Sequence, residues 1–155
     1  MCATKLGSRP GYLWSVLSLK CSRCRKGNMF KIKNSYNLKG FMKMNDRCPV
    51  CDQPMEIEIG FYYGTGYVSY ALAFVFSIMT FILWWVSIGF SLSDDDNRLS
   101  WWIGFNIFSL IMLQPYLMRL SRSLWLSFFV GYNAGWALEK PEQPERMVPG
   151  QMNNW

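Results

Sequence analysis

The stretch 59–93 is IGFYYGTGYVSYALAFVFSIMTFILWWVSIGFSLS, 35 consecutive residues without a charged side chain. A helix of about 20 apolar residues crosses the hydrocarbon core of a bilayer, so this stretch is long enough to span one. A second run of 20 uncharged residues, 99–118, follows a short polar interruption. A soluble fold of 155 residues rarely leaves such runs uncharged. We therefore predict two membrane spans, near 67–90 and 100–116.

Charge patterning gives these spans an orientation. Residues 1–58 carry a net charge of +7, residues 93–98 a net charge of −2, and residues 119–155 a net charge of +1. Because basic segments stay on the cytoplasmic side, we expect both termini in the cytoplasm and the acidic outer loop on the other side of the membrane. The tryptophans at 84–85 and 101–102 fall near that loop, as in an interfacial aromatic belt.

Four of the five cysteines form two C-x-x-C hooks separated by 23 residues. The first hook is Cys21-Ser-Arg-Cys24 and the second hook is Cys48-Pro-Val-Cys51. Each places two thiolates on one tight turn, and two such turns complete the tetrahedron that Zn²⁺ prefers. A reducing cytoplasm disfavours disulfides. We therefore predict a structural zinc site of Cys21, Cys24, Cys48 and Cys51, with rubredoxin-like iron as the alternative. Cys2 lies outside the pattern.

The head, residues 1–58, has too little apolar sequence for a large core, so the metal would supply much of its folding free energy. Three short segments beside the hooks have strand-like composition: 29–32, 41–44 and 55–59. The expected fold is thus a small β-rich zinc ribbon followed by an all-α membrane hairpin.

The residues that flank the hooks carry further expectations. Gly27 follows the first hook and is expected to supply a positive-φ turn. Such hooks prefer glycine directly after the second cysteine, where this chain has Arg25 and Asp52. Arg23, Arg25 and Lys26 would partly neutralise the net negative charge that a zinc tetrathiolate carries.

Residues 119–138 allow two interpretations. One helical face repeats apolar side chains at three- and four-residue steps: Leu117, Leu120, Leu124, Phe128 and Tyr132. The helix either lies in the cytoplasmic interface as an amphipathic membrane-associated helix, with Arg119 and Arg122 near lipid phosphates, or continues the second span as one long helix. A third span over 123–138 would be short for the requirement of about 20 residues.

The expected organisation has four parts, and the overall mean hydropathy of +0.04 averages over them. They are the cytoplasmic basic zinc-ribbon head (1–58), the two-helix transmembrane hairpin (59–118) with its outer loop (93–98), the amphipathic helix (119–138) and a polar, proline-containing tail (139–155).

Composition excludes several functions. The chain contains no histidine, which removes Ser-His-Asp and Cys-His catalysis. Neither predicted span contains a charged residue, so neither offers a proton relay for transport. The basic, aromatic-rich head could bind nucleic acid, but the same positive charge is what a cytoplasmic head beside anionic lipid requires.

The order of these parts resembles the bacterial membrane family catalogued as domain of unknown function 983, especially its Bacteroidetes-like branch. The resemblance extends over residues 17–133 and rests on four segments: 21–30, 36–38, 44–51 and the Gly60-Phe-Tyr-Tyr-Gly64 entry to the first span. It implies a protein of the bacterial cytoplasmic (inner) membrane, with a cysteine-rich head on about two spans and both termini in the cytoplasm. Some members are encoded near haem–copper oxidase genes, which implies a role in respiratory assembly.

We accordingly expect a non-enzymatic integral membrane adaptor, or an accessory or assembly subunit of a membrane protein complex. Its partners would be the lipid bilayer and that complex, with no small-molecule substrate. Two alternatives stay open: a metal or thiol-redox helper for a haem–copper oxidase, and a membrane-tethered nucleic-acid-binding zinc ribbon.

Overall fold

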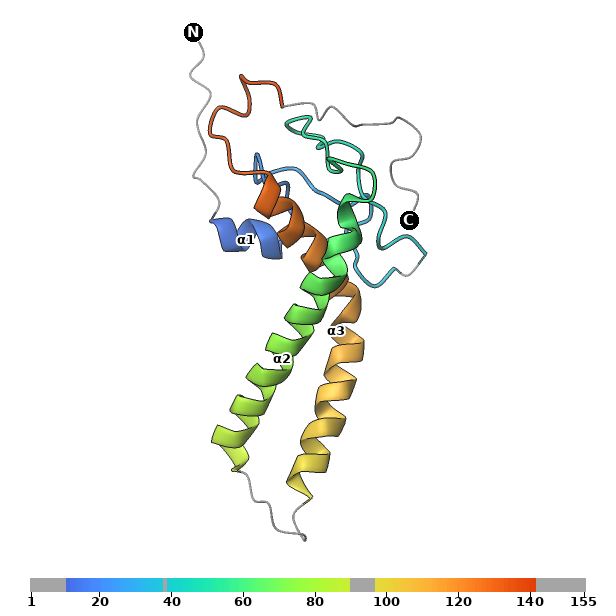
Figure 1. Cartoon of the computed structure of the whole chain (residues 1–155), viewed down its shortest axis with the longest axis vertical. Coiled ribbons are helices and arrows are strands. Elements are labelled where there is room, and N and C mark those ends of the chain that lie inside the picture. The colour runs from blue at the N-terminus through green and yellow to red at the C-terminus, as the bar shows by residue number, and fades with distance from the viewer. Residues whose placement is uncertain (1–10, 38, 90–96, 142–155) are drawn as a thin grey trace.

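A computed structural model describes residues 11–37, 39–89 and 97–141. The chain forms a helical hairpin that carries the two hooks at one end (Figure 1). Its helices are α1 (Tyr12–Leu17), the 3-10 helix η1 (Phe61–Gly64), α2 (Thr65–Ile88) and α3 (Arg98–Phe129). Cys2, most of the acidic loop and residues 142–155 lie outside the described residues.

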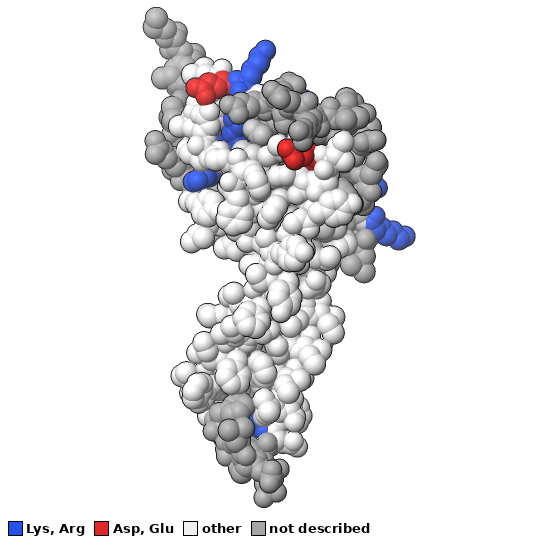
Figure 2. All heavy atoms as spheres, viewed as in Figure 1, with Lys and Arg blue, Asp and Glu red and all other residues white. Residues whose placement is uncertain are grey.

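Two helices are long and apolar enough to cross a membrane, over Phe61–Ile88 and Arg98–Phe129. The most apolar window of the first has none of its residues buried within the protein. Charged side chains gather on the hook-bearing end, while the visible face of the hairpin is almost free of them (Figure 2). Apolar surface of this extent is unusual for a protein surrounded by water.

Aromatic and polar side chains hold α2 against α3. Near the tip of the hairpin, the rings of Phe81 and Trp102 meet edge to face with centroids 5.1 Å apart. Further along, Asn106 of α3 donates from its Nδ2 to the hydroxyl of Ser77 on α2 at 3.2 Å. A hydrogen bond between apolar helices satisfies polar groups that lipid cannot, so this pair fixes the register of the hairpin.

α3 is one continuous helix of 32 residues. At 1.5 Å per residue it is about 48 Å long, which exceeds a bilayer core of about 30 Å. Pro115 lies inside α3 without ending it. Of the two interpretations of residues 119–138, the structure has the continuous helix as far as Phe129. The buried residues of α3 all lie in its later part, where it packs on the head: Leu117, Arg119 to Ser123, and Leu126.

The expected β-rich zinc ribbon is wrong, because the described residues contain no β-strand. Isolated antiparallel bridges occur instead at three places: Lys20–Asn28, Phe30–Met44 and Arg47–Pro54. The first and third bridges close the two hooks, and the second joins the segments that follow and precede them. The head is therefore built from turns that single bridges hold together.

Two arginines of α3 explain why no ladder forms. Arg119 is fully buried and points into the loop that connects the hooks. Its guanidinium donates to the backbone carbonyls of Phe41 at 2.6 Å, Ile32 at 2.9 Å, Asn34 at 3.1 Å and Lys33 at 3.2 Å. Arg122 donates to the carbonyl of Met42 at 3.1 Å. These carbonyls face α3 and not a neighbouring strand, so both arginines bind the backbone of the head.

Replacing Arg119 should therefore unfold the connecting loop. Hydrogen bonds from a charged donor contribute about 1.5–3 kcal/mol each, so we expect Arg119→Ala to lower the unfolding free energy of the head by at least about 3 kcal/mol. Arg119→Lys keeps the charge but loses the planar, forked guanidinium. The unfolding free energy of its head should therefore lie between those of the wild type and Arg119→Ala. Proteolysis of the loop in denaturant measures this. Arg98→Ala, at the exposed start of α3, is the control, and equal resistance of all variants would contradict the account.

Candidate metal centre

The four hook thiols meet at one point in the head. The Sγ atoms of Cys21 and Cys51 are 3.7 Å apart, as are those of Cys24 and Cys48. All four sulfur atoms lie within 4.8 Å of one another and all four residues are buried. A disulfide needs a sulfur–sulfur distance of about 2.05 Å. Metal–sulfur bonds of about 2.3 Å in a tetrahedron require sulfur atoms about 3.8 Å apart, so this cluster could bind a metal ion.

Both hooks use the same backbone turn. The N–H of Arg25 donates to the carbonyl of Cys21 at 2.8 Å, and the N–H of Asp52 donates to the carbonyl of Cys48 at 3.0 Å. Arg25 and Asp52 adopt left-handed φ values of 55° and 57°. That conformation suits glycine best, which explains the usual preference after the second cysteine. The chain forms the turn without glycine, so other interactions of the site must offset the backbone strain at Arg25 and Asp52.

Gly27 has a role other than the expected one. Its φ is not positive, because the positive-φ glycines among the described residues are Gly60 and Gly89. A Cβ atom on Gly27 would instead lie 2.3 Å from the Sγ of Cys48. Its N–H also donates to the Sγ of Cys24 at 3.5 Å. Gly27 therefore lets the first hook approach the second closely.

The thiols lie in an apolar shell to which the long helices contribute. The shell consists of Met29, Phe30, Met44, Met55, Tyr62 and Leu126. Tyr62 comes from η1 and Leu126, which is fully buried, from α3. The hydroxyl of Tyr62 donates to the carbonyl of Met55. The cluster therefore lies where the head rests on the hairpin.

Hydrogen bonds between the thiols shift their pKa values in opposite directions. The hydrogen bond with Cys21 lowers the pKa of Cys24, and the same contact raises the pKa of Cys21. The hydrogen bond with Cys21 also lowers the pKa of Cys48 to about 7. Metal ions bind thiolates, so an incoming ion displaces the remaining protons and acid favours its release.

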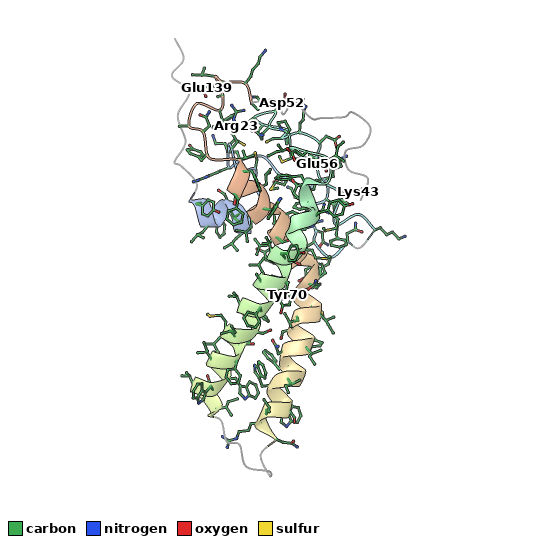
Figure 3. The ribbon with its side chains drawn as sticks, viewed as in Figure 1. Arg23, Lys43, Asp52, Glu56, Tyr70 and Glu139 are labelled. Carbon is green, nitrogen blue, oxygen red and sulfur yellow. The ribbon has the colours of Figure 1, made fainter. Side chains whose placement is uncertain are left out.

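The segment after α3, residues 130–141, folds back over the hooks. The N–H of Asn133 donates to the carbonyl of Arg23 at 3.2 Å, and the guanidinium of Arg23 donates to the carbonyl of Glu139 at 2.7 Å. Figure 3 shows Arg23 and Glu139 together at the outer end of the head. Arg25 lies over the ring of Tyr132 at 4.5 Å and Lys26 over Trp136 at 5.2 Å.

Arg23, Arg25 and Lys26, which we expected to neutralise the thiolates, thus hold residues 130–141 in place. No sequence pattern predicted that residues 130–141 would cover the hooks. The only signal was the presence of aromatic residues, Tyr132 and Trp136, just before the polar tail. The segment and the second hook border an open groove of about 880 Å³ lined by Cys48, Cys51 and Trp136, among others.

A methyl group at Gly27 should weaken metal binding. Overpacking of a tight site costs about 1–3 kcal/mol, so Gly27→Ala should lower metal affinity by about tenfold or more. Competition with a chelating dye measures it. Gly131→Ala is the matched control, because a Cβ atom there meets nothing within 4 Å. If Gly27→Ala bound metal as tightly as Gly131→Ala, the close approach of the hooks would not limit the site.

Comparison with known proteins gives a single result. No curated protein and no solved structure matches the chain. The family described as "Protein of unknown function (DUF983)" matches residues 38–129, more than half of the chain. The match includes the second hook, η1, α2 and α3, while the first hook precedes it. The resemblance seen in the sequence is thereby confirmed, and the chain belongs to this family of unknown function.

Proposed function

We propose that the chain is a non-enzymatic integral membrane accessory or assembly subunit whose structural zinc site fixes a basic cytoplasmic head to a two-helix anchor. The observation that carries the proposal is the set of contacts between the head and the long helices. Leu126 and Tyr62 pack against the thiol cluster, and Arg119 binds the loop between the hooks. A metal in this cluster would set the position of the head on the helices, which suits a part that presents a surface to a partner.

The aromatic residues of the hairpin support membrane insertion. Tyr67 and Trp85 are both largely exposed, at 84% and 57%. They stand 18 residues apart in α2, which corresponds to about 27 Å along the helix. A bilayer core is about 30 Å thick, and Tyr and Trp favour its two interfaces. The basic head then lies in the cytoplasm with both termini, and the acidic loop lies across the inner membrane.

The closed geometry of the thiol cluster supports a structural zinc ion. Structural zinc sites have four protein ligands, whereas catalytic sites keep one position for water or substrate. All four cysteines are at most 7% exposed. A buried tetrathiolate without an open position offers a substrate no point of attack, which favours the non-enzymatic assignment.

One observation favours the alternative of a metal or thiol-redox helper. Cys48 and Cys51 of the second hook line the open groove beside residues 136–141, which gives the second hook a route to a partner that accepts metal. The nucleic-acid alternative lacks such an observation, since Arg23, Arg119 and Arg122 are buried and add little to a basic surface.

Metal analysis of the purified full chain distinguishes these functions. A structural role predicts about one zinc per chain, no colour and no reducible disulfide. Cys48→Ser should lose the zinc and become sensitive to protease, and Cys2→Ser should keep it. Redox-active iron or copper, or zinc far below one equivalent that Cys48→Ser leaves unchanged, would overturn the structural site.

Extraction of cell membranes tests the anchor independently of the metal. We expect the chain to stay in the membrane fraction at alkaline pH in carbonate, because two spans insert irreversibly. Reporter fusions at either terminus should be active in the cytoplasm. Release of the chain by carbonate would refute the membrane anchor whatever the metal content.

A further inference from the structure

A second cavity, separate from the thiol cluster, lies between the end of α1, the segment after the first hook and α3. Its volume is about 310 Å³, and a water molecule occupies about 30 Å³ in the liquid, so there is room for a phosphate group. Three basic side chains line it: Lys20, Lys33 and Arg119. None of its lining residues is acidic or a cysteine. The cavity is thus positively charged and takes no part in the metal site.

The buried charge at this cavity has no counter-ion in the part of the chain that the structure describes. Every hydrogen-bond acceptor of Arg119 is neutral, either a backbone carbonyl or the hydroxyl of Ser35. Lys20 donates from its Nζ to the Oδ1 of Asn28 at 2.6 Å, which is also neutral. A buried charge is costly unless an opposite charge accompanies it. An anion would complete the cavity.

The position of α1 shows where that anion would come from. Val16 of α1 packs on Leu117 of α3, and Leu72 of α2 borders the same apolar cluster. The hydroxyl of Tyr116 donates to the carbonyl of Leu17 at 2.8 Å. Figure 1 shows α1 beside α3, crosswise to the hairpin, where the head meets the long helices. α1 therefore lies near the head-side ends of both long apolar helices, beside Leu72 near the start of α2 and Leu117 in the later part of α3.

The outward side of α1 is apolar. Leu13 is 72% exposed, Trp14 71% and Leu17 49%. Tryptophan and leucine on one side of a short helix at this depth suit the boundary between headgroups and acyl chains. The cavity includes Ser18 and Lys20, directly after α1 ends at Leu17. The cavity therefore lies at the level of the phospholipid headgroups.

We propose that this cavity binds the phosphate of an anionic phospholipid of the cytoplasmic leaflet, with Lys20 and Lys33 contacting the phosphate and Arg119 supplying buried positive charge behind them. The inference rests on the membrane insertion proposed above. Lysine ammonium groups bind phosphate as point charges, and basic cavities at the cytoplasmic side of membrane helices suit anionic headgroups. No lining residue is acidic, so the ammonium of a zwitterionic headgroup finds no partner. Phosphatidylglycerol is expected to bind in preference to phosphatidylcholine.

The test compares three forms of the full chain in nanodiscs that contain phosphatidylcholine with or without phosphatidylglycerol. They are the wild type, Lys20→Gln/Lys33→Gln, and the control Lys43→Gln/Lys140→Gln. The control removes the same charge from exposed positions outside the cavity; Figure 3 labels Lys43 at the margin of the head. Native mass spectrometry counts the lipids that each form retains.

We expect the wild type and the control to retain phosphatidylglycerol selectively. In the variant Lys20→Gln/Lys33→Gln, the preference for phosphatidylglycerol over phosphatidylcholine should fall at least about tenfold. Equal preference in all three forms would mean attraction by overall charge and would overturn the site. So would the absence of a preference in the wild type, or displacement of the lipid by inorganic phosphate at equal concentration, which would indicate a soluble ligand.

Two readouts separate this proposal from the preceding one. The metal content of each form reports folding, and Lys33→Gln alone, at an exposed residue, provides a milder variant with the same expected direction. Carbonate extraction reports insertion. A chain that is inserted and loaded with metal but lacks lipid preference would overturn the lipid site alone, whereas a chain that carbonate releases would overturn the membrane anchor itself.

Discussion

Convergence of the four thiols is the constraint on which the rest of the structure depends. The two hooks are 23 residues apart in sequence, yet their sulfur atoms lie within 4.8 Å of one another. Binding of structural zinc contributes about 10–16 kcal/mol in zinc-finger peptides, which is comparable with the whole stability of an ordinary domain, about 5–15 kcal/mol. A head that has three isolated bridges and no strand among its described residues needs a contribution of that size.

The head also depends on helices that begin outside it. Leu126 completes the apolar shell of the thiols, and Arg119 binds four carbonyls of the connecting loop. Metal binding at this cluster would therefore be coupled, through the same residues, to the folding of the head and the position of the last turns of α3. Any rearrangement of the thiols would disturb the packing of Leu126, so its effect would extend into α3.

Much of this architecture could be predicted from sequence because the relevant signals are local. Runs of uncharged residues specify the helices, and C-x-x-C spacing specifies the thiols. The strands were predicted wrongly because the acceptors of Arg119 are set by a contact across 78 residues, which no local pattern contains. For the same reason, the strand-like composition of 29–32 and 41–44 could not show that carbonyls of this loop face α3. The contact between Gly27 and the Sγ of Cys48 could not be predicted either, because it joins residues that are 21 positions apart in sequence.

We propose that the four cysteines hold one metal ion in a closed tetrahedral site. X-ray absorption at the metal edge of the purified full chain reports the ligands of that ion. We expect zinc with four sulfur ligands at about 2.3 Å and no nitrogen or oxygen ligand. A first coordination sphere with fewer than four sulfur atoms, or one completed by oxygen or nitrogen, would contradict it.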